Sequence, residues 1–167
     1  MSALIHALDN FARLSGRLVS WLMLVMTAVC CAIVLLRYGF NAGSTALQEV
    51  LLYCHGTAFM LGAAYTLQQD EHVRVDIFYQ RFSQRQKAWV DAIGTLVFLL
   101  PFCLFLFVSG TVFFRSAWLI REGSSEPGGL AYVYLFKGLI PLAMLLLAVQ
   151  ALSLLLRNAG ILVRRTH

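Results

Sequence analysis

Residues 18–37, LVSWLMLVMTAVCCAIVLLR, form an apolar stretch that is almost uninterrupted until Arg37 closes it. A transmembrane helix needs about 20 mostly apolar residues to cross the hydrocarbon core of a bilayer. Three more stretches of this kind follow, and the four together predict spans at about residues 18–38, 45–68, 89–118 and 130–157. Helices are expected because lipid cannot hydrogen-bond to a free backbone, and the alternating pattern of a membrane β-barrel is absent.

Composition supports the same class. Of the 167 residues 60% are apolar and 13% are charged, whereas a soluble domain is about half apolar and about a quarter charged. Too few charges remain to cover a water-soluble surface, and four spans leave no room for a separate soluble domain. The prediction is an all-α membrane protein, with residues 1–167 forming a single four-helix membrane domain.

The basic residues predict the orientation. Nine of the 13 Lys and Arg residues lie in the N-terminal segment, the connection between the second and third spans, and the C-terminal segment. Because basic residues concentrate on the cytoplasmic side, both termini and the connection at residues 70–87 are predicted to be cytoplasmic. The connections near residues 39–44 and 122–129 then face outward.

Two amphipathic segments flank the spans. The first apolar stretch is too long for a signal peptide and no A-x-A-like cleavage site follows it, so it is expected to be retained. In residues 1–17, Leu4, Leu8 and Phe11 recur at helical spacing, which predicts an interfacial helix. In the cytoplasmic connection, Val75, Phe78 and Phe82 predict a second, shorter interfacial helix. Its arginines would face anionic headgroups.

Glu49 is the only acidic residue within the second span. Thr45 and Gln48 fit a capping box, which would place Glu49 about 6 Å inside the helix start. That depth is interfacial, and a helix N-terminus favours a negative charge. Arg37 ends the preceding span on the same side and could pair with Glu49. A structural or partner-facing role for Glu49 is therefore favoured over a proton or ion site.

Other polar and small residues in the spans suggest packing. Gly62 follows Cys54 and Ala58 at four-residue spacing, a stripe that lets another helix approach closely, in this chain or another. Gln150 is expected to bridge helices by a hydrogen bond, and Lys137 to extend toward the outer interface. Pro101 should kink the third span.

His55 raises the question of a haem, but no second histidine lies within a span to complete a bis-histidine site. A packed, hydrogen-bonded histidine is preferred. The four cysteines also lie inside apolar spans without metal-ligand spacing, and we expect them to act as small packing residues. No P-loop, nucleophile elbow or metal cluster appears, so the chain is predicted not to be an enzyme.

Several segments in order suggest a family. They are RYGFN at 37–41, Glu49, LGAAY at 61–65, EHVRVD at 71–76 and KGLIPLAMLLLAVQ at 137–150. Together they resemble the small integral-membrane (DctQ-type) subunit of tripartite ATP-independent periplasmic (TRAP) transporters, from about Arg37 to Arg157. The segment HVRVD is the most specific part.

This resemblance implies a bacterial inner-membrane protein that scaffolds a large multi-spanning TRAP subunit. The large subunit would carry sodium and substrate, and a periplasmic binding protein would deliver an organic acid anion. The small subunit would need no cofactor and no nucleic acid, while membrane lipids, including bound phospholipid, are expected partners. The implied structural or interface residues include Arg37, Glu49, His72, Arg74 and Asp76.

Two alternatives remain at this stage. The chain could be the membrane anchor of a redox complex, which a Soret absorption band would reveal. It could also be an independent small transporter, which transport by this chain alone in liposomes would reveal.

Overall fold

The computed structural model describes residues 2–69 and 82–163, and within these ranges it contains helices and no strand. Four long helices are apolar enough to cross a membrane, at Val19–Gly39, Thr45–Leu67, Gln84–Ile120 and Val133–Leu162. The prediction of four helical spans is thus confirmed. The elements are α1 (Ser2–Gly39), α2 (Thr45–Gln68), α4 (Gln84–Gly94), η1 (Thr95–Leu99), α5 (Leu100–Ile120), α6 (Val133–Lys137) and α7 (Leu139–Val163).

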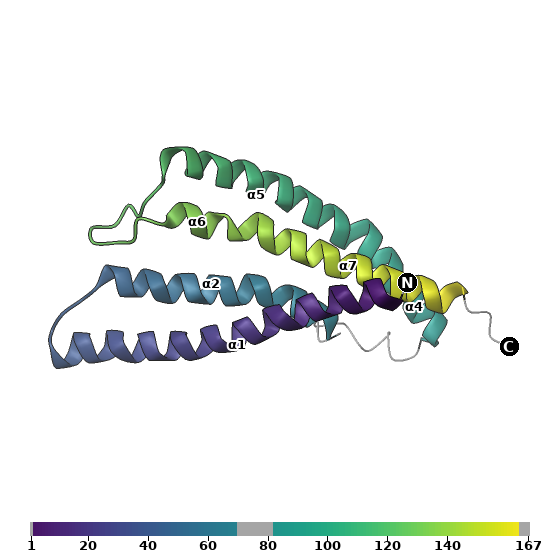
Figure 1. The fold of residues 1–167 in the computed structure, drawn as a ribbon, viewed down its shortest axis with the longest axis horizontal. Coiled ribbons are helices and arrows are strands. Elements are labelled where there is room, and N and C mark those ends of the chain that lie inside the picture. Colours follow the sequence, from purple (N-terminus) through teal and green to yellow (C-terminus); the bar gives the residue numbers. More distant parts are fainter. Residues whose placement is uncertain (1, 70–81, 164–167) are drawn as a thin grey trace.

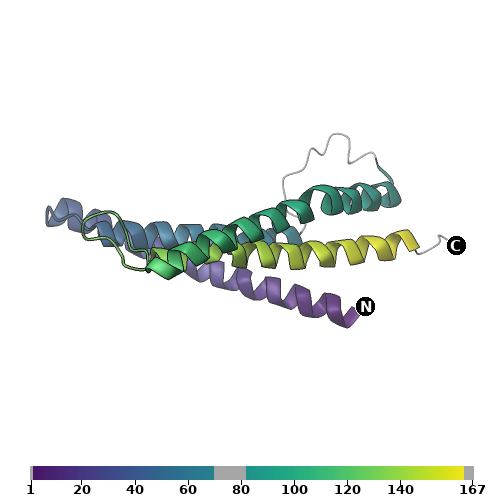
Figure 2. The same ribbon diagram turned by 90° about the horizontal axis from the view of Figure 1, so that it is seen from above.

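The helices form an open arrangement (Figure 1), running from one edge to the other in the order α5, α7, α2, α1. α1 packs along α2 and α5 packs along α7, while contacts between α2 and α7 join the two pairs. The start of α1 and the end of α7 lie at the same end of the molecule (Figures 1 and 2). The connections at residues 40–44 and 121–132 lie at the other end, which we call the connection end.

The third span begins earlier than expected, at Gln84, because Ser83 starts the helix with a capping box. The Ser83 hydroxyl accepts a hydrogen bond from the Gln86 N–H, and the Gln86 side chain accepts one from the Ser83 N–H at 2.8 Å. Both bonds satisfy donors that a helix start otherwise leaves open.

Pro101 distorts this long span as predicted. Just before it, η1 is a turn of π-helix in which the Leu100 N–H donates to the Thr95 carbonyl. Proline has no N–H and its ring clashes with the preceding turn, and π-helical turns relieve such clashes. The bend between α4 and α5 is visible in Figure 2.

Two glycines allow helices to approach closely. A Cβ added at Gly56 would lie 2.5 Å from the Phe136 ring, and one added at Gly110 would lie 2.7 Å from Cγ2 of Ile140. Gly56 lets α6 pack against α2, and Gly110 lets α7 pack against α5. Contacts of this kind replace the hydrophobic effect as the source of helix association in lipid.

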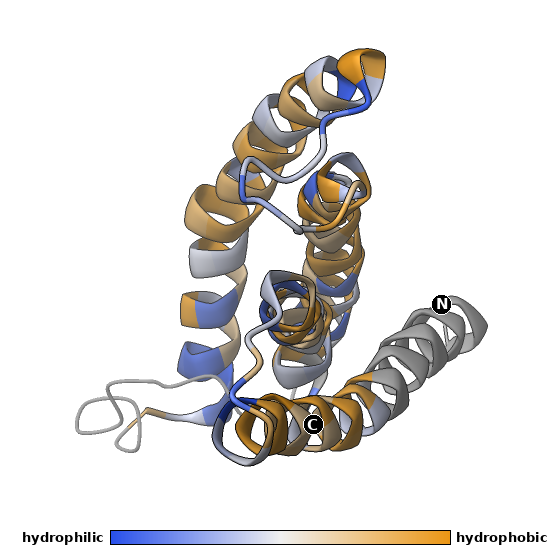
Figure 3. Ribbon diagram, turned by 90° about the vertical axis from the view of Figure 1, so that its left-hand side faces the viewer, coloured by the Kyte–Doolittle hydropathy of each residue, from blue (hydrophilic) through white to orange (hydrophobic). Residues whose placement is uncertain are grey.

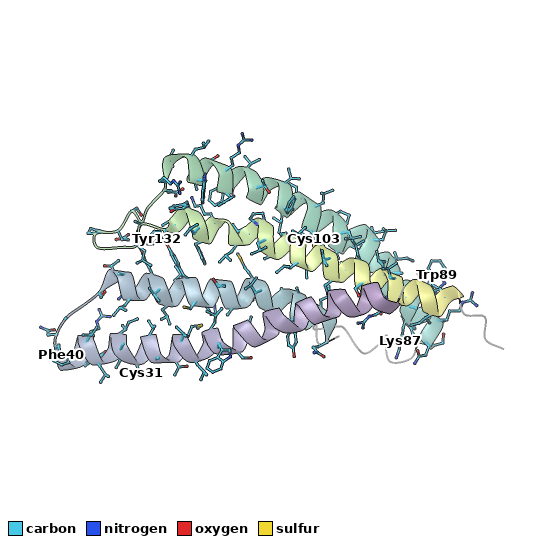
Figure 4. All side chains as sticks on the ribbon, in the orientation of Figure 1. Cys31, Phe40, Lys87, Trp89, Cys103 and Tyr132 are labelled. Carbon is cyan, nitrogen blue, oxygen red and sulfur yellow. The ribbon has the colours of Figure 1, made fainter. Side chains whose placement is uncertain are left out.

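The buried core is small. Its main cluster consists of Leu67, Cys103, Leu147 and Ala151, and Figure 4 shows Cys103 between α5 and α7. About half of the larger apolar side chains in the described part of the chain are exposed, and hydrophobic residues extend along the described helices (Figure 3). A surface this apolar is covered by lipid or by another protein.

The structure describes only one of the two segments that were predicted to be interfacial helices. Residues 2–17 are helical and continue into the first span without a break, so α1 is one 38-residue helix. That the N-terminal segment lies at the membrane interface stays a prediction. The other segment falls mainly on residues 70–81, which lie outside the described residues.

Candidate functional site

The connection end carries a cluster of polar contacts built around the first turn of α2. This helix begins at Thr45, as expected, but its cap is Ser44, whose hydroxyl accepts a hydrogen bond from the Leu47 N–H at 3.4 Å. The predicted capping box of Thr45 and Gln48 was therefore wrong by one residue. Ser44 has the extended backbone of an N-cap, whereas Thr45 is already helical.

Glu49 binds the connection between α5 and α6. The Ser124 hydroxyl donates to one carboxylate oxygen, and the Leu130 N–H donates to the other at 2.6 Å. The Ser124 N–H also donates to the Leu130 carbonyl at 2.8 Å, which closes residues 124–130 into a loop. Glu49 thus holds both ends of this loop, and we refer to Glu49, Ser124 and Leu130 as the carboxylate clamp.

Gly129 makes room for the clamp. A Cβ at this position would overlap the Ser124 side chain and would lie 2.6 Å from the Glu49 carboxylate. The Gly129 N–H donates to the Glu126 carbonyl at 3.0 Å, and the Glu126 N–H donates to the Ser124 hydroxyl at 3.1 Å. The loop is therefore ordered by its own backbone as well as by Glu49.

An ion pair stabilises the ends of this connection. Lys137 Nζ lies 2.6 Å from both carboxylate oxygens of Glu122 and 4.0 Å from the centre of the Phe113 ring. The lysine side chain is only 17% exposed. Lys137 thus extends toward the connection at residues 121–132, and the Glu122 carboxylate of that connection binds its charge.

Arg121 ends α5 in the left-handed conformation, with φ and ψ both at 50°. Its guanidinium lies 4.4 Å from the centre of the Trp118 ring and 5.3 Å from that of Tyr134. Cation–π contacts of this kind fix the side chain where the backbone reverses. Nothing in the sequence indicated the contact between Arg121 and Tyr134, because these two residues are far apart in the chain.

Arg37 does not pair with Glu49. Its exposed side chain lines a small pocket of about 50 Å³ at the α1–α2 turn together with Gln48, and no ion pair joins it to Glu49 in the described part of the chain. Successive residues of a helix are rotated by about 100°. Gln48 therefore faces α1, while Glu49 faces the connection between α5 and α6.

The other candidate residues are dispersed. Gly62 faces Val19 of α1 at 3.9 Å from an added Cβ, so the neighbour of this stripe lies in the same chain. Gln150 is 3% exposed, and its side-chain oxygen accepts no hydrogen bond, so a bridge to another helix through that atom is not formed; the bridge as a whole stays a prediction. His72, Arg74 and Asp76 lie outside the described residues.

Two expectations about packing were wrong. His55 is exposed on the outer face of α2, and none of the described residues forms a hydrogen bond with it. Cys30 and Cys31 are exposed as well, and only Cys103 is buried. His55 lies on the same face of α2 as Leu52 and Phe59, which are also exposed.

In the clamp, both oxygens of the only carboxylate of the second span already accept hydrogen bonds from the protein. A family model describing the DctQ component of tripartite ATP-independent periplasmic transporters matches residues 8–160. The chain belongs to this family. DctQ proteins are transporter components and not enzymes, so the resemblance noted in the sequence is confirmed. Comparisons with curated proteins and with solved structures gave no match.

Membership in the DctQ family also decides between the alternatives. A component of a TRAP transporter is neither the anchor of a redox complex nor a transporter that acts alone. DctQ components work in general with a large membrane subunit and a substrate-binding protein. The polar contacts of the connection end are thus those of an accessory membrane subunit.

Proposed function

We propose that this DctQ component is the small permease subunit of a sodium-coupled TRAP transporter in the bacterial inner membrane. It scaffolds the large transport subunit and helps to dock the periplasmic binding protein, and the assembly takes up an organic acid anion. Both termini lie in the cytoplasm, as the distribution of basic residues indicates. The connection end then faces the periplasm.

The observation that carries this proposal is the family match over residues 8–160. The geometry agrees with an accessory role. A pocket between α1 and α2 is an open groove of about 600 Å³ lined mainly by apolar side chains. An anionic substrate needs converging charged or polar groups in an enclosed site. We therefore assign the substrate and sodium sites to the large subunit.

The scaffold role draws on the exposed apolar faces. A membrane helix bundle with so small a core leaves extensive surface for a partner subunit and for phospholipid. The docking role draws on the carboxylate clamp, because a loop held at both ends presents a fixed surface to a soluble partner. Both roles need no cofactor in this chain.

Reconstitution into liposomes tests the proposal. The small and large subunits are reconstituted together, and sodium-driven uptake of organic acids is measured with and without the binding protein. We expect uptake only when both membrane subunits and the binding protein are present. Uptake by this chain alone would overturn the proposal, and so would recovery of the tagged chain without a large subunit from its native membrane in several mild detergents.

A further inference from the structure

The outer face of the α1–α2 pair carries the groove of about 600 Å³. Most of its lining is apolar, with Met23 and Cys30 from α1 and Leu52 from α2. Polar side chains interrupt this lining at Thr27, Gln48 and His55. The groove is therefore not a plain lipid-facing surface.

His55 lies at the middle of the predicted membrane thickness. It is ten residues beyond the start of the Thr45–Leu67 span, which corresponds to about 15 Å along the helix in a core about 30 Å thick. The imidazole is exposed there, and nothing in the described part of the chain hydrogen-bonds to it. The Thr27 hydroxyl, by contrast, donates to the Met23 carbonyl of its own helix at 3.0 Å.

Lipid cannot satisfy such a side chain. Acyl chains offer neither donors nor acceptors, so an unpaired imidazole at the centre of the bilayer is strongly disfavoured. The outward face of η1 and α5 shows the contrasting chemistry, with Phe98 of η1 and Phe102 and Phe105 of α5 exposed at 73%, 54% and 67%. A phenylalanine surface suits lipid, whereas the His55 face needs a polar partner at the same depth.

We propose that the α1–α2 groove receives a transmembrane helix of the large subunit, with a hydroxyl, amide or carboxylate side chain that hydrogen-bonds to His55. The large subunit as occupant rests on the proposed function. The choice of the groove as the binding surface rests on the depth and exposure of His55. Leu52 and Cys30 would pack against the apolar part of the incoming helix, and the phenylalanine face of α5 would remain in lipid.

Site-specific photo-crosslinking tests which face binds the partner. A photoreactive residue replaces Leu52 in the groove or, as the matched control, Phe105 on α5, in cells that express the complete transporter. The two side chains are 58% and 67% exposed. We expect Leu52 to crosslink to the large subunit and Phe105 not to do so. Crosslinking from Phe105 alone, or from Leu52 only to lipid or to a second copy of this chain, would overturn the inference.

Co-purification separates the two proposals. If the tagged wild-type chain does not retain the large subunit, the proposed function fails. If it retains the large subunit but the crosslink forms only from Phe105, the proposed function stands and the assignment of the groove fails.

Substitution of His55 measures the hydrogen bond. We expect His55→Leu to weaken retention of the large subunit by about three- to tenfold, and His55→Gln to preserve most of it. The melting temperature of the isolated chain should not fall in either variant, because His55 has no hydrogen-bond partner among the described residues. Equal retention of wild type and His55→Leu would contradict a buried polar contact at this position.

Discussion

Glu49 accepts hydrogen bonds from two different kinds of donor, the hydroxyl of Ser124 and the backbone N–H of Leu130. The donors lie at the two ends of one loop, so the carboxylate joins α2 to a connection about 80 residues away in sequence. Each oxygen accepts one hydrogen bond from this loop, so the carboxylate fixes the loop to α2, and this favours a structural role.

Replacement of Glu49 by Gln and by Ala distinguishes the two roles. A glutamine can accept from the Leu130 N–H and donate to the Ser124 hydroxyl, so we expect Glu49→Gln to retain assembly and most uptake. Glu49→Ala leaves the Leu130 N–H without its acceptor, and we expect lower thermal stability together with reduced assembly and uptake. Loss of uptake in Glu49→Gln with normal assembly would instead indicate ion coupling.

Gly129 offers an independent test of the clamp. A Cβ at this position would overlap Ser124 and lie 2.6 Å from the Glu49 carboxylate, so Gly129→Ala should destabilise the protein by about 1–3 kcal/mol. Gly123→Ala is the control, because its nearest neighbour would be the Ala131 Cα at 3.5 Å, an ordinary contact. Thermal unfolding in detergent and proteolysis of the loop measure the effect. Equal stability of both variants would show that the clamp adapts freely.

At the scale of the helices, Gly110 sets the distance between α5 and α7. We expect Gly110→Ala to destabilise the pair by about 1–3 kcal/mol, since the new Cβ would lie 2.7 Å from Cγ2 of Ile140. Gly94→Ala is the matched control, because no atom lies within 4 Å of its added Cβ. That control should gain up to about 1 kcal/mol from higher helix propensity. Thermal unfolding of the two variants gives the comparison, and a stable Gly110→Ala variant would contradict close packing.

Gln150 is the buried amide in the middle of α7. Its side-chain oxygen is buried without a hydrogen-bond partner, and an unpaired polar atom in an apolar interior lowers the stability of the fold. We expect Gln150→Leu to raise the stability of the isolated chain by about 1 kcal/mol. A lower melting temperature of Gln150→Leu would instead indicate that the amide forms the predicted hydrogen bond to another helix.

At the scale of the whole molecule, the start of α1 and the end of α7 lie on one side, and the connections at residues 40–44 and 121–132 lie on the other (Figures 1 and 2). Figure 4 places Lys87 and Trp89 at the end opposite Phe40 and Tyr132. The open order of helices leaves α1 and α5 at opposite edges. A subunit of this shape can bind a large partner along one face while lipid covers the other.

Labelling of single cysteines tests the orientation. We expect Glu126→Cys, in the connection between α5 and α6, to react with a membrane-impermeant thiol reagent in intact spheroplasts. Gln84→Cys, at the start of α4, should react only after the membrane is permeabilised. Both positions are exposed at the two ends of the described structure. The reverse pattern would show that the basic residues do not determine the orientation as predicted.

The sequence by itself determined the class of protein and the four helical spans. Hydropathy reports the length of each apolar stretch, and a helix is the form that satisfies the backbone of such a stretch in lipid. The distortion of the third span was also predictable from the sequence, because Pro101 has no backbone N–H to donate. The segments from RYGFN to KGLIPLAMLLLAVQ pointed to the family that the match over residues 8–160 then confirmed.

Only the tertiary structure decided which side chains meet. Ser124 and Leu130, and not the nearby Arg37, bind Glu49, because the rotation of one residue along α2 turns Glu49 away from α1. The exposed position of His55 likewise depends on where α1 and α7 pack around α2. In lipid almost every residue of a span is apolar, so hydropathy does not mark the buried face, and helix packing assigns it.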